Sequence, residues 1–167
     1  MRSADSKLGP VAGPVPVDDL DRQIIEALQE KGRASFREIA AAVGVSEATI
    51  RSRYQRLSAA NVLHVVGVTN PLSLGFDAIA MLGVKVSGSP VAAGAEIAKW
   101  SEATYVVLTA GQFDLLVEVV CTDRDDLLDV IGRIRELPEV LTTESFVYLS
   151  LVKQLYDWGT REPEQVR

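Results

Sequence analysis

The chain has 167 residues, of which 47% are hydrophobic and 24% are charged, and it carries a formal net charge of −6. This composition is typical of a globular protein with room for two small domains, and no apolar run reaches the roughly 20 residues that cross a bilayer. The first residues lack the basic-then-apolar order of a secretory signal, so we expect a cytoplasmic protein. Because Cys121 is the only cysteine, an internal disulfide is excluded. Cys121 and the single histidine, His64, provide too few ligands for a Cys/His metal site.

Residues 1–17 contain three prolines and two glycines without apolar periodicity, which predicts a flexible arm. A first helix follows, because apolar residues then recur every four positions. Asp18 and Asp19 are candidate N-caps, and Gly32 is expected to end the helix in a left-handed conformation. The apolar stripe of this helix is Leu20, Ile24 and Leu28.

The next segment has the pattern of two short helices joined by a tight turn. Ser35 and Glu38 have the spacing of a capping box, and the helix that they begin ends at Gly44. Ser46 is the N-cap of a third helix that runs to about Ala59. Two helices joined by a tight glycine-containing turn form a helix-turn-helix unit.

The third helix concentrates positive charge in an otherwise acidic protein. At about 100° per residue, Ile50, Tyr54 and Leu57 form the buried face. We place Thr49, Ser52, Arg53 and Arg56 on the far side and Arg51 on the flank, with Glu47 the only acid on this helix. A solvated helix face explains such arginines equally well in isolation. The preceding capped helix, the tight turn and the scarcity of acid favour contact with DNA phosphates.

Residues 62–68 are rich in β-branched side chains, which predicts a short strand or wing, with His64 as a surface or packing residue. We therefore divide the chain into a flexible arm (1–17), a winged helix-turn-helix domain (18–68), a linker (69–77), a second domain (78–155) and a C-terminal tail (156–167). Acidic and basic residues balance in the first domain, whereas acidic residues predominate in the second.

The second half alternates strands and helices in the order β-α-β-β-α-β of a ferredoxin-like α+β domain. The expected strands are 78–86, 105–110, 115–121 and 140–152, with Cys121 buried in the third. Ser89 and Pro90 begin a helix that runs to Ser101. Asp123 caps a second helix, which ends before Pro138 and whose apolar stripe is Leu127, Leu128, Ile131 and Ile134.

Residues 18–155 resemble the Lrp/AsnC (feast/famine) family of transcriptional regulators. The matching stretches are LDRQIIEALQEKGRASFREIAAAVGVSEATIRSRYQRL, NPLSLG, AGQFDLLVEV and LPEVLTTESFVYLSLVK. Two positions depart from the family pattern: Ala60-Asn61 replaces the glycine that usually ends the recognition helix, and Glu139 replaces the glycine of Leu-Pro-Gly-Val. Asn61 tolerates a left-handed backbone, so the first departure is mild.

The resemblance implies a sequence-specific DNA-binding regulator that binds double-stranded DNA and a small effector, such as an amino acid, without a cofactor, and that forms homodimers and octamers. It implies that the second domain (78–155) is the effector-sensing and oligomerisation domain. It implies that the DNA contacts are made by Ser46, Thr49, Arg51, Ser52, Arg53 and Arg56. The implied effector loop consists of Gly111, Gln112, Phe113 and Asp114. Backbone amides of this turn could hold a carboxylate and Asp114 an ammonium group, although the same four residues also suit an ordinary hairpin turn.

Two alternatives from other classes remain. Some haem-pathway decarboxylases share the two-domain fold, but the sequence has no nucleophile motif, metal-ligand pair or phosphate loop, so we do not expect an enzyme. The other alternative is a sensing or assembly module whose DNA-binding domain is vestigial.

Overall fold

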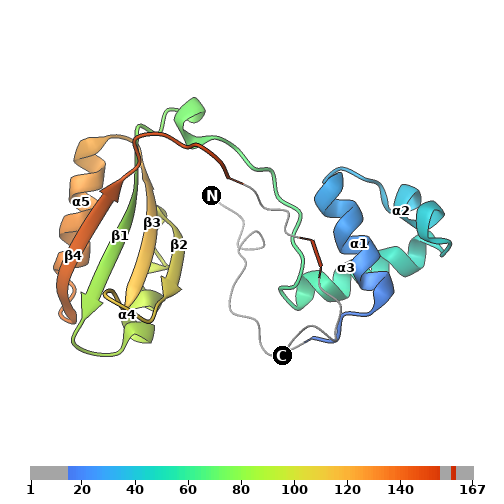
Figure 1. Ribbon diagram of the computed structural model, residues 1–167, viewed down its shortest axis with the longest axis horizontal. Coiled ribbons are helices and arrows are strands. Elements are labelled where there is room, and N and C mark those ends of the chain that lie inside the picture. The colour runs from blue at the N-terminus through green and yellow to red at the C-terminus, as the bar shows by residue number, and fades with distance from the viewer. Residues whose placement is uncertain (1–14, 155–158, 161–167) are drawn as a thin grey trace. The chain divides into compact units, whose positions relative to one another are not determined.

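The computed structural model describes residues 15–154 and 159–160, which fall into two compact units. The first contains the described residues up to Val68 together with those from Lys153 onward, and the second is Thr69–Val152. Both units are shown in Figure 1, and each is described separately below. Within the described residues, no helix is long and apolar enough to span a membrane.

The described residues of the first unit form three helices, α1 (Asp19–Glu30), α2 (Phe36–Val43) and α3 (Glu47–Ala59). The predicted capping box is confirmed, because Ser35 and Glu38 each accept a hydrogen bond from the other's backbone amide. Gly44 ends α2 with φ 75°, and Ser46 caps α3. The core consists of Ile24, Ile25, Leu28, Ile39, Ala40, Ile50, Leu57 and Leu63.

Three predictions for the first unit are wrong. Residues 62–68 pair with no described strand, so the described residues contain no wing strand. Helix α1 ends at Glu30 with Lys31 as its C-cap at φ −134°, and Gly32 does not have the left-handed backbone that was predicted. Pro16 and Val17 are not free, since Val17 packs on the core and the Pro16 carbonyl accepts from Arg56. The rest of the predicted arm lies outside the described residues.

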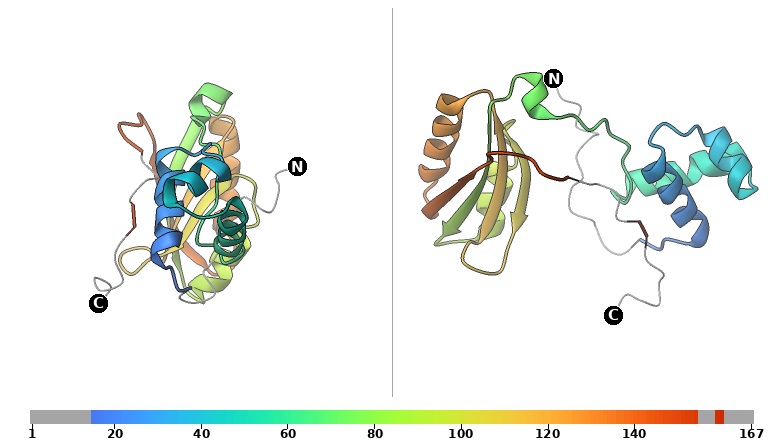
Figure 2. Two further views of the ribbon diagram at one scale, coloured as in Figure 1. Left: turned by 90° about the vertical axis from the view of Figure 1, so that its right-hand side faces the viewer. Right: turned by 45° about the horizontal axis from the view of Figure 1, so that its top comes forward.

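The second unit begins with the 3-10 helix η2 (Pro71–Leu74) and contains a four-stranded antiparallel sheet and two helices. Its elements follow in the order β1 (Ala78–Val86), α4 (Pro90–Ile97), β2 (Ala103–Leu108), β3 (Leu115–Cys121), α5 (Arg124–Arg135) and β4 (Val140–Val147). The strands lie in the order β2-β3-β1-β4, which confirms the predicted α+β topology (Figure 2).

The core of this unit lies between the two helices and one face of the sheet. Alternate residues of β1 and β3 point into it, as the period-two geometry of strands requires, and Cys121 is buried as predicted. Burial raises the pKa of the Cys121 thiol to about 11. The core consists of Ala78, Ala80, Leu82, Val84, Val86, Ala93, Ile97, Leu115, Val117, Val119, Cys121, Leu127, Val130 and Ile134.

The predicted element ends in the second unit were partly wrong. Helix α4 stops at Ile97 instead of Ser101, β2 begins at Ala103 instead of Tyr105, and β4 ends at Val147. Leu128 is 65% exposed, whereas Val130 is buried in its place. The 3.6-residue period explains this, because Leu127, Val130 and Ile134 share one side of α5 and Leu128 is turned away by about 100°.

Candidate functional site

Helix α3 has a solvent-exposed face on the side away from its buried residues. Ile50 and Leu57 are fully buried and Tyr54 is half-buried, as predicted. The Ser46 hydroxyl lies 2.8 Å from that of Thr49 and accepts from the Thr49 amide, so both predicted contact residues also build the N-terminal cap of the helix. The exposed residues on α3 are Glu47, Ala48, Arg51, Ser52, Gln55 and Ala59.

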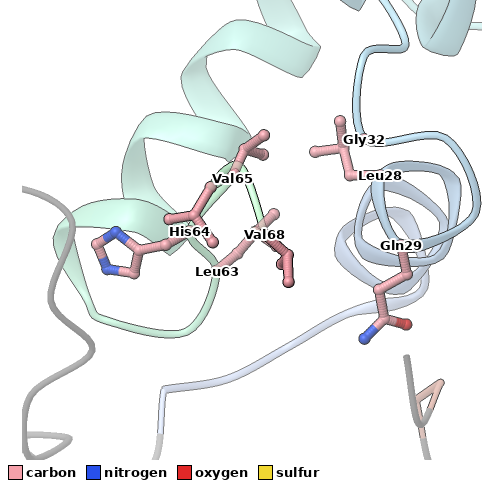
Figure 3. A pocket seen from close by; sticks show the side chains of 8 residues that line it. Leu28, Gln29, Gly32, Leu63, His64, Val65 and Val68 are labelled. Atoms are coloured by element: carbon pink, nitrogen blue, oxygen red, sulfur yellow. The ribbon is translucent and has the colours of Figure 1, made fainter. Parts of the chain in front are cut away.

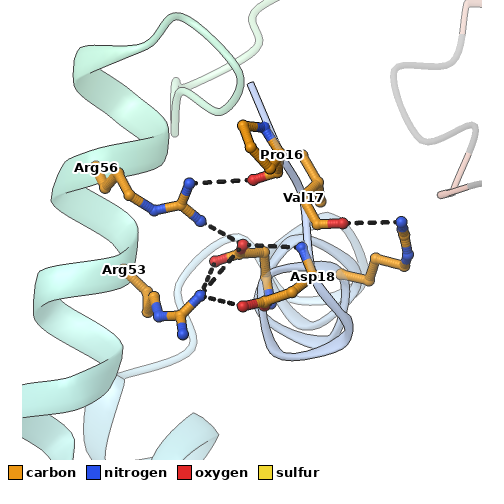
Figure 4. A network of polar contacts seen from close by, with 7 residues as sticks. Pro16, Val17, Asp18, Arg53 and Arg56 are labelled. Carbon is orange, nitrogen blue, oxygen red and sulfur yellow. Dashed lines mark hydrogen bonds and ion pairs between the residues drawn. The ribbon is translucent and has the colours of Figure 1, made fainter. Parts of the chain in front are cut away.

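Arg53 and Arg56 turn back toward the beginning of α1 instead of facing outward (Figure 4). Arg53 forms an ion pair with Asp18 and lies 3.3 Å from an oxygen of Asp21. Arg56 forms an ion pair with Asp21 and donates to the Pro16 carbonyl at 3.1 Å. The Asp21 side chain is fully buried, so these contacts balance a carboxylate that would otherwise lack compensation inside the protein.

The prediction that Arg53 and Arg56 lie on the far side of the helix is therefore wrong. Arg53 is only about 60° from Ile50 around the helix, so its side chain reaches α1. There the guanidinium groups of Arg53 and Arg56 form ion pairs with Asp18 and Asp21. The position that the sequence reasoning missed is Gln55. It lies about 140° from Ile50 and is exposed, and the period of 3.6 residues was sufficient to identify it.

Arg51, predicted on the flank, is exposed and held from two sides. Its guanidinium group donates to Glu47 at 2.8 Å and lies 5.3 Å from the centre of the Phe36 ring. Phe36 in turn packs against Tyr54, with 5.2 Å between ring centres. Contacts with a carboxylate and a ring face preorganise the guanidinium at the surface, where it can still donate to other acceptors.

The predicted effector loop joins β2 to β3 in the second unit. Gly111 and Gln112 are exposed, whereas Phe113 and Asp114 are half-buried. The Asp114 carboxylate accepts from the Val86 amide at 2.9 Å and from the Lys85 ammonium at 3.1 Å. These two hydrogen bonds, the Val86 amide first, hold the pKa of Asp114 below its usual range. Asp114 thus ties the loop to the end of β1 and is already paired.

Phe113 fixes the other side of this loop. Its ring lies over Gly83 of β1, where an added Cβ atom would come within 2.6 Å of the ring carbons. The same ring meets Phe146 of β4 edge to face, with 6.3 Å between the ring centres. Glycine is therefore required at position 83 for close approach of the aromatic ring, and the loop is anchored by a ring as well as by a carboxylate.

A pocket of about 290 Å³ lies in the first unit, between the end of α1 and the segment that was predicted as a wing (Figure 3). It is lined by Leu28, Gln29, Gly32, Leu63, His64, Val65, Val66 and Val68. The His64 Nε2 atom donates to the side-chain oxygen of Asn61 at 3.1 Å, which agrees with the prediction of a surface or packing residue. Asn61 has φ 56°, so it provides the left-handed end of the α3 turn that the sequence suggested. Across the described ranges, no cluster of three metal-binding side chains occurs.

Comparisons with known proteins match both units. The model of the AsnC-type helix-turn-helix domain covers residues 17–58, and that of the Lrp/AsnC ligand binding domain covers residues 79–158. The HTH-type transcriptional regulator FL11 of Pyrococcus horikoshii is 30% identical over 142 residues, which cover 84% of this chain and 94% of that protein. The regulatory protein AsnC of Escherichia coli is 30% identical over 137 residues, covering 80% of this chain and 90% of that protein.

Solved structures agree. The feast or famine regulatory protein of Mycobacterium tuberculosis, complexed with L-methionine, has a TM-score of 0.73 and 26% identity, and the match covers 83% of this chain and 96% of that one. Because the two family models together match both units in order and these relatives are matched over most of their length, the chain belongs to the Lrp/AsnC family of transcriptional regulators.

Proposed function

We propose that this protein regulates transcription by placing α3 in the major groove of double-stranded DNA, and that its second unit binds a small effector, an amino acid or a related metabolite. The observation that carries the first part is the capped α2, the left-handed Gly44 turn and the exposed face of α3. A helix of this length fits the major groove, and its exposed side chains reach base edges and phosphates. A DNA-binding regulator acts in the cytoplasm, and no catalytic role is proposed.

The proposed DNA contacts are Ser46, Thr49, Arg51, Ser52, Arg53 and Arg56, and the exposure of Gln55 adds it to this set. Arg51 and Ser52 test the proposal most cleanly, since they are exposed and do not contact Asp21. Arg51→Ala should weaken binding to a duplex from the protein's own promoter region by about 1–3 kcal/mol if it contacts a base, and should make the salt slope shallower if it contacts a phosphate.

The matched control for Arg51→Ala is Arg124→Ala, which removes an exposed arginine from the second unit. Fluorescence anisotropy at several salt concentrations measures both variants. Equal affinity of Arg51→Ala and Arg124→Ala would remove the exposed face of α3 from the interface. Failure of the wild-type protein to bind any duplex would instead favour a vestigial DNA-binding domain.

The effector is proposed to bind at Gly111, Gln112, Phe113 and Asp114. A related protein of known structure is complexed with L-methionine, which supports an amino acid as the class of effector. An effector ammonium group that pairs with Asp114 has to compete with Lys85, because the carboxylate already accepts from it. Gly111 and Gln112 are exposed and are proposed to present backbone amides to the carboxylate of the effector.

A thermal-shift screen of the amino acids identifies a ligand, because ligand binding to the native state raises its melting temperature. Calorimetry then compares the wild type with Asp114→Asn, which retains an acceptor for the Val86 amide but loses the charge. We expect at least a tenfold loss of affinity. Asp129→Asn, an exposed acid on α5, is the control. Unchanged effector affinity in Asp114→Asn would exclude Asp114 from effector binding and leave it only a structural role in the turn.

The homodimer and octamer remain proposals. The face of the sheet opposite α4 and α5 carries Met81, Leu116, Val120, Tyr105 and Phe146, and Tyr105 and Phe146 are 54% and 46% exposed. The same face also carries Lys85, Glu118 and Glu144, and a face with this mixture of exposed aromatic, aliphatic and charged side chains favours coverage by a second copy. A fragment from Thr69 to Arg167 should fold and remain at least dimeric in light scattering at micromolar concentration, and a monomeric fragment would contradict this assembly.

A further inference from the structure

Each arginine of α3 is paired with a carboxylate of the protein itself. Arg51 pairs with Glu47, Arg53 with Asp18 and Arg56 with Asp21. The sequence of α3 shows a single acid against three arginines, but the beginning of α1 contributes two more. The surface around the recognition helix is therefore much less positive than its own sequence indicates.

The two acids of α1 are in different environments. The Asp21 side chain is 0% exposed and accepts from Arg53, from Arg56 and from the Asp18 amide, so it cannot move into water without breaking the fold. The Asp18 side chain is 53% exposed and its partner Arg53 is 33% exposed. A carboxylate at the surface can be hydrated when its partner leaves, whereas a buried one cannot.

We propose that the Asp18 carboxylate is an internal substitute for a DNA phosphate: it holds Arg53 in the free protein, and on DNA Arg53 transfers to a phosphate oxygen while Asp18 is released to water. Carboxylates and phosphates present the same kind of anionic oxygen to a guanidinium group. This inference rests on the DNA-binding function proposed above, and it makes Asp18 a positioning residue that lowers DNA affinity through Arg53.

Two further observations support this exchange. The Asp18 carboxylate remains ionised at neutral pH, since the Asp21 amide and then Arg53 lower its pKa to about 2. Asp18 is also the N-cap of α1 and accepts from the Asp21 amide at 3.0 Å, so it stays near Arg53 when the pair opens. The released charge then lies close to the phosphates and opposes binding.

The test compares Asp18→Asn with Asp19→Asn in binding to a mixed-sequence 30-base-pair duplex. Asparagine is as good an N-cap as aspartate, so Asp18→Asn removes the charge but keeps the cap. Asp19 is exposed and has no ion-pair partner in the described part of the chain, so Asp19→Asn removes the same charge one residue away. A long-range charge effect would change both variants equally.

We expect Asp18→Asn to bind about three- to tenfold more tightly than Asp19→Asn at 50 mM salt, with a slope of log affinity against log salt that is steeper by up to about 0.9. Adding Arg53→Gln to Asp18→Asn should remove this difference. Asp18→Ser repeats the comparison with another good N-cap if the asparagine variant folds poorly.

Equal affinities and slopes for Asp18→Asn and Asp19→Asn would overturn the inference, and so would weaker binding by a folded Asp18→Asn. These results leave the proposed function intact as long as the wild-type protein binds the duplex. A wild-type protein that binds neither this duplex nor its own promoter region would refute the proposed function itself.

Discussion

Replacing Asp21 by alanine should destabilise the helical unit by about 2–3 kcal/mol. Removing one partner of a buried ion pair typically costs about 3–5 kcal/mol, because the other charge is left without compensation. Here the partners can recover part of this, since Arg53 and Arg56 are 33% and 39% exposed and can be hydrated. Arg53 also retains its ion pair with Asp18, and Arg56 retains its hydrogen bond to the Pro16 carbonyl. The Asp18 amide, in contrast, loses its acceptor in the capping box.

Hydrogen–deuterium exchange of the whole protein measures this cost separately in each unit, because local opening free energies differ across a structure. At about 1.4 kcal/mol per tenfold change, amides of α1 and α3 should exchange about 30 to 150 times faster in Asp21→Ala. Amides of α5 are the internal control. Asp19→Ala, an exposed substitution in the same turn, should change exchange less than about threefold.

An increase of less than about threefold over Asp19→Ala would refute the reasoning, because it would mean that the Asp21 carboxylate contributes no more than a surface acid. A double variant with Arg56→Met adds a second check. Since the two side chains are in contact, its destabilisation should be clearly smaller than the sum of the single effects.

Three further substitutions test other parts of the structure. Gln55→Ala should leave stability unchanged and relax base preference at one position of the bound DNA, by about 1–3 kcal/mol in a selection from random duplexes; an unchanged profile would exclude Gln55 from base contact. Gly83→Ala should displace the Phe113 ring and lower the melting temperature of the second unit by an amount equivalent to about 1–3 kcal/mol, and a wild-type melting curve would contradict the close contact. Glu38 has its pKa lowered to about 2, first by the Ser35 amide, so it stabilises the fold above the ordinary carboxyl pKa and this is lost as pH falls toward 2. Acid titration followed by circular dichroism should therefore be flatter for Glu38→Gln, and identical curves would refute this role.

Local features of the sequence were sufficient to predict most elements of this fold. The Ser35–Glu38 capping box, the Gly44 turn and the Ser46 cap each depend on residues within four positions of one another, and all three occur as predicted. The predicted burial of Cys121 in β3 is also confirmed. Such signals are local, because caps and periodicities are properties of a single segment.

Contacts between distant segments were decided by the tertiary structure. Residues 62–68 have the composition of a strand but no described partner strand, and a strand is formed only by pairing. Arg53 and Arg56 could be assigned to a helix but not matched to Asp18 and Asp21, which lie more than thirty positions earlier in the chain. Helical periodicity gives the direction of a side chain relative to its own helix, whereas the group that it meets depends on how the helices pack. For Arg53 and Arg56, packing against α1 replaced the expected open face with buried and half-exposed carboxylates.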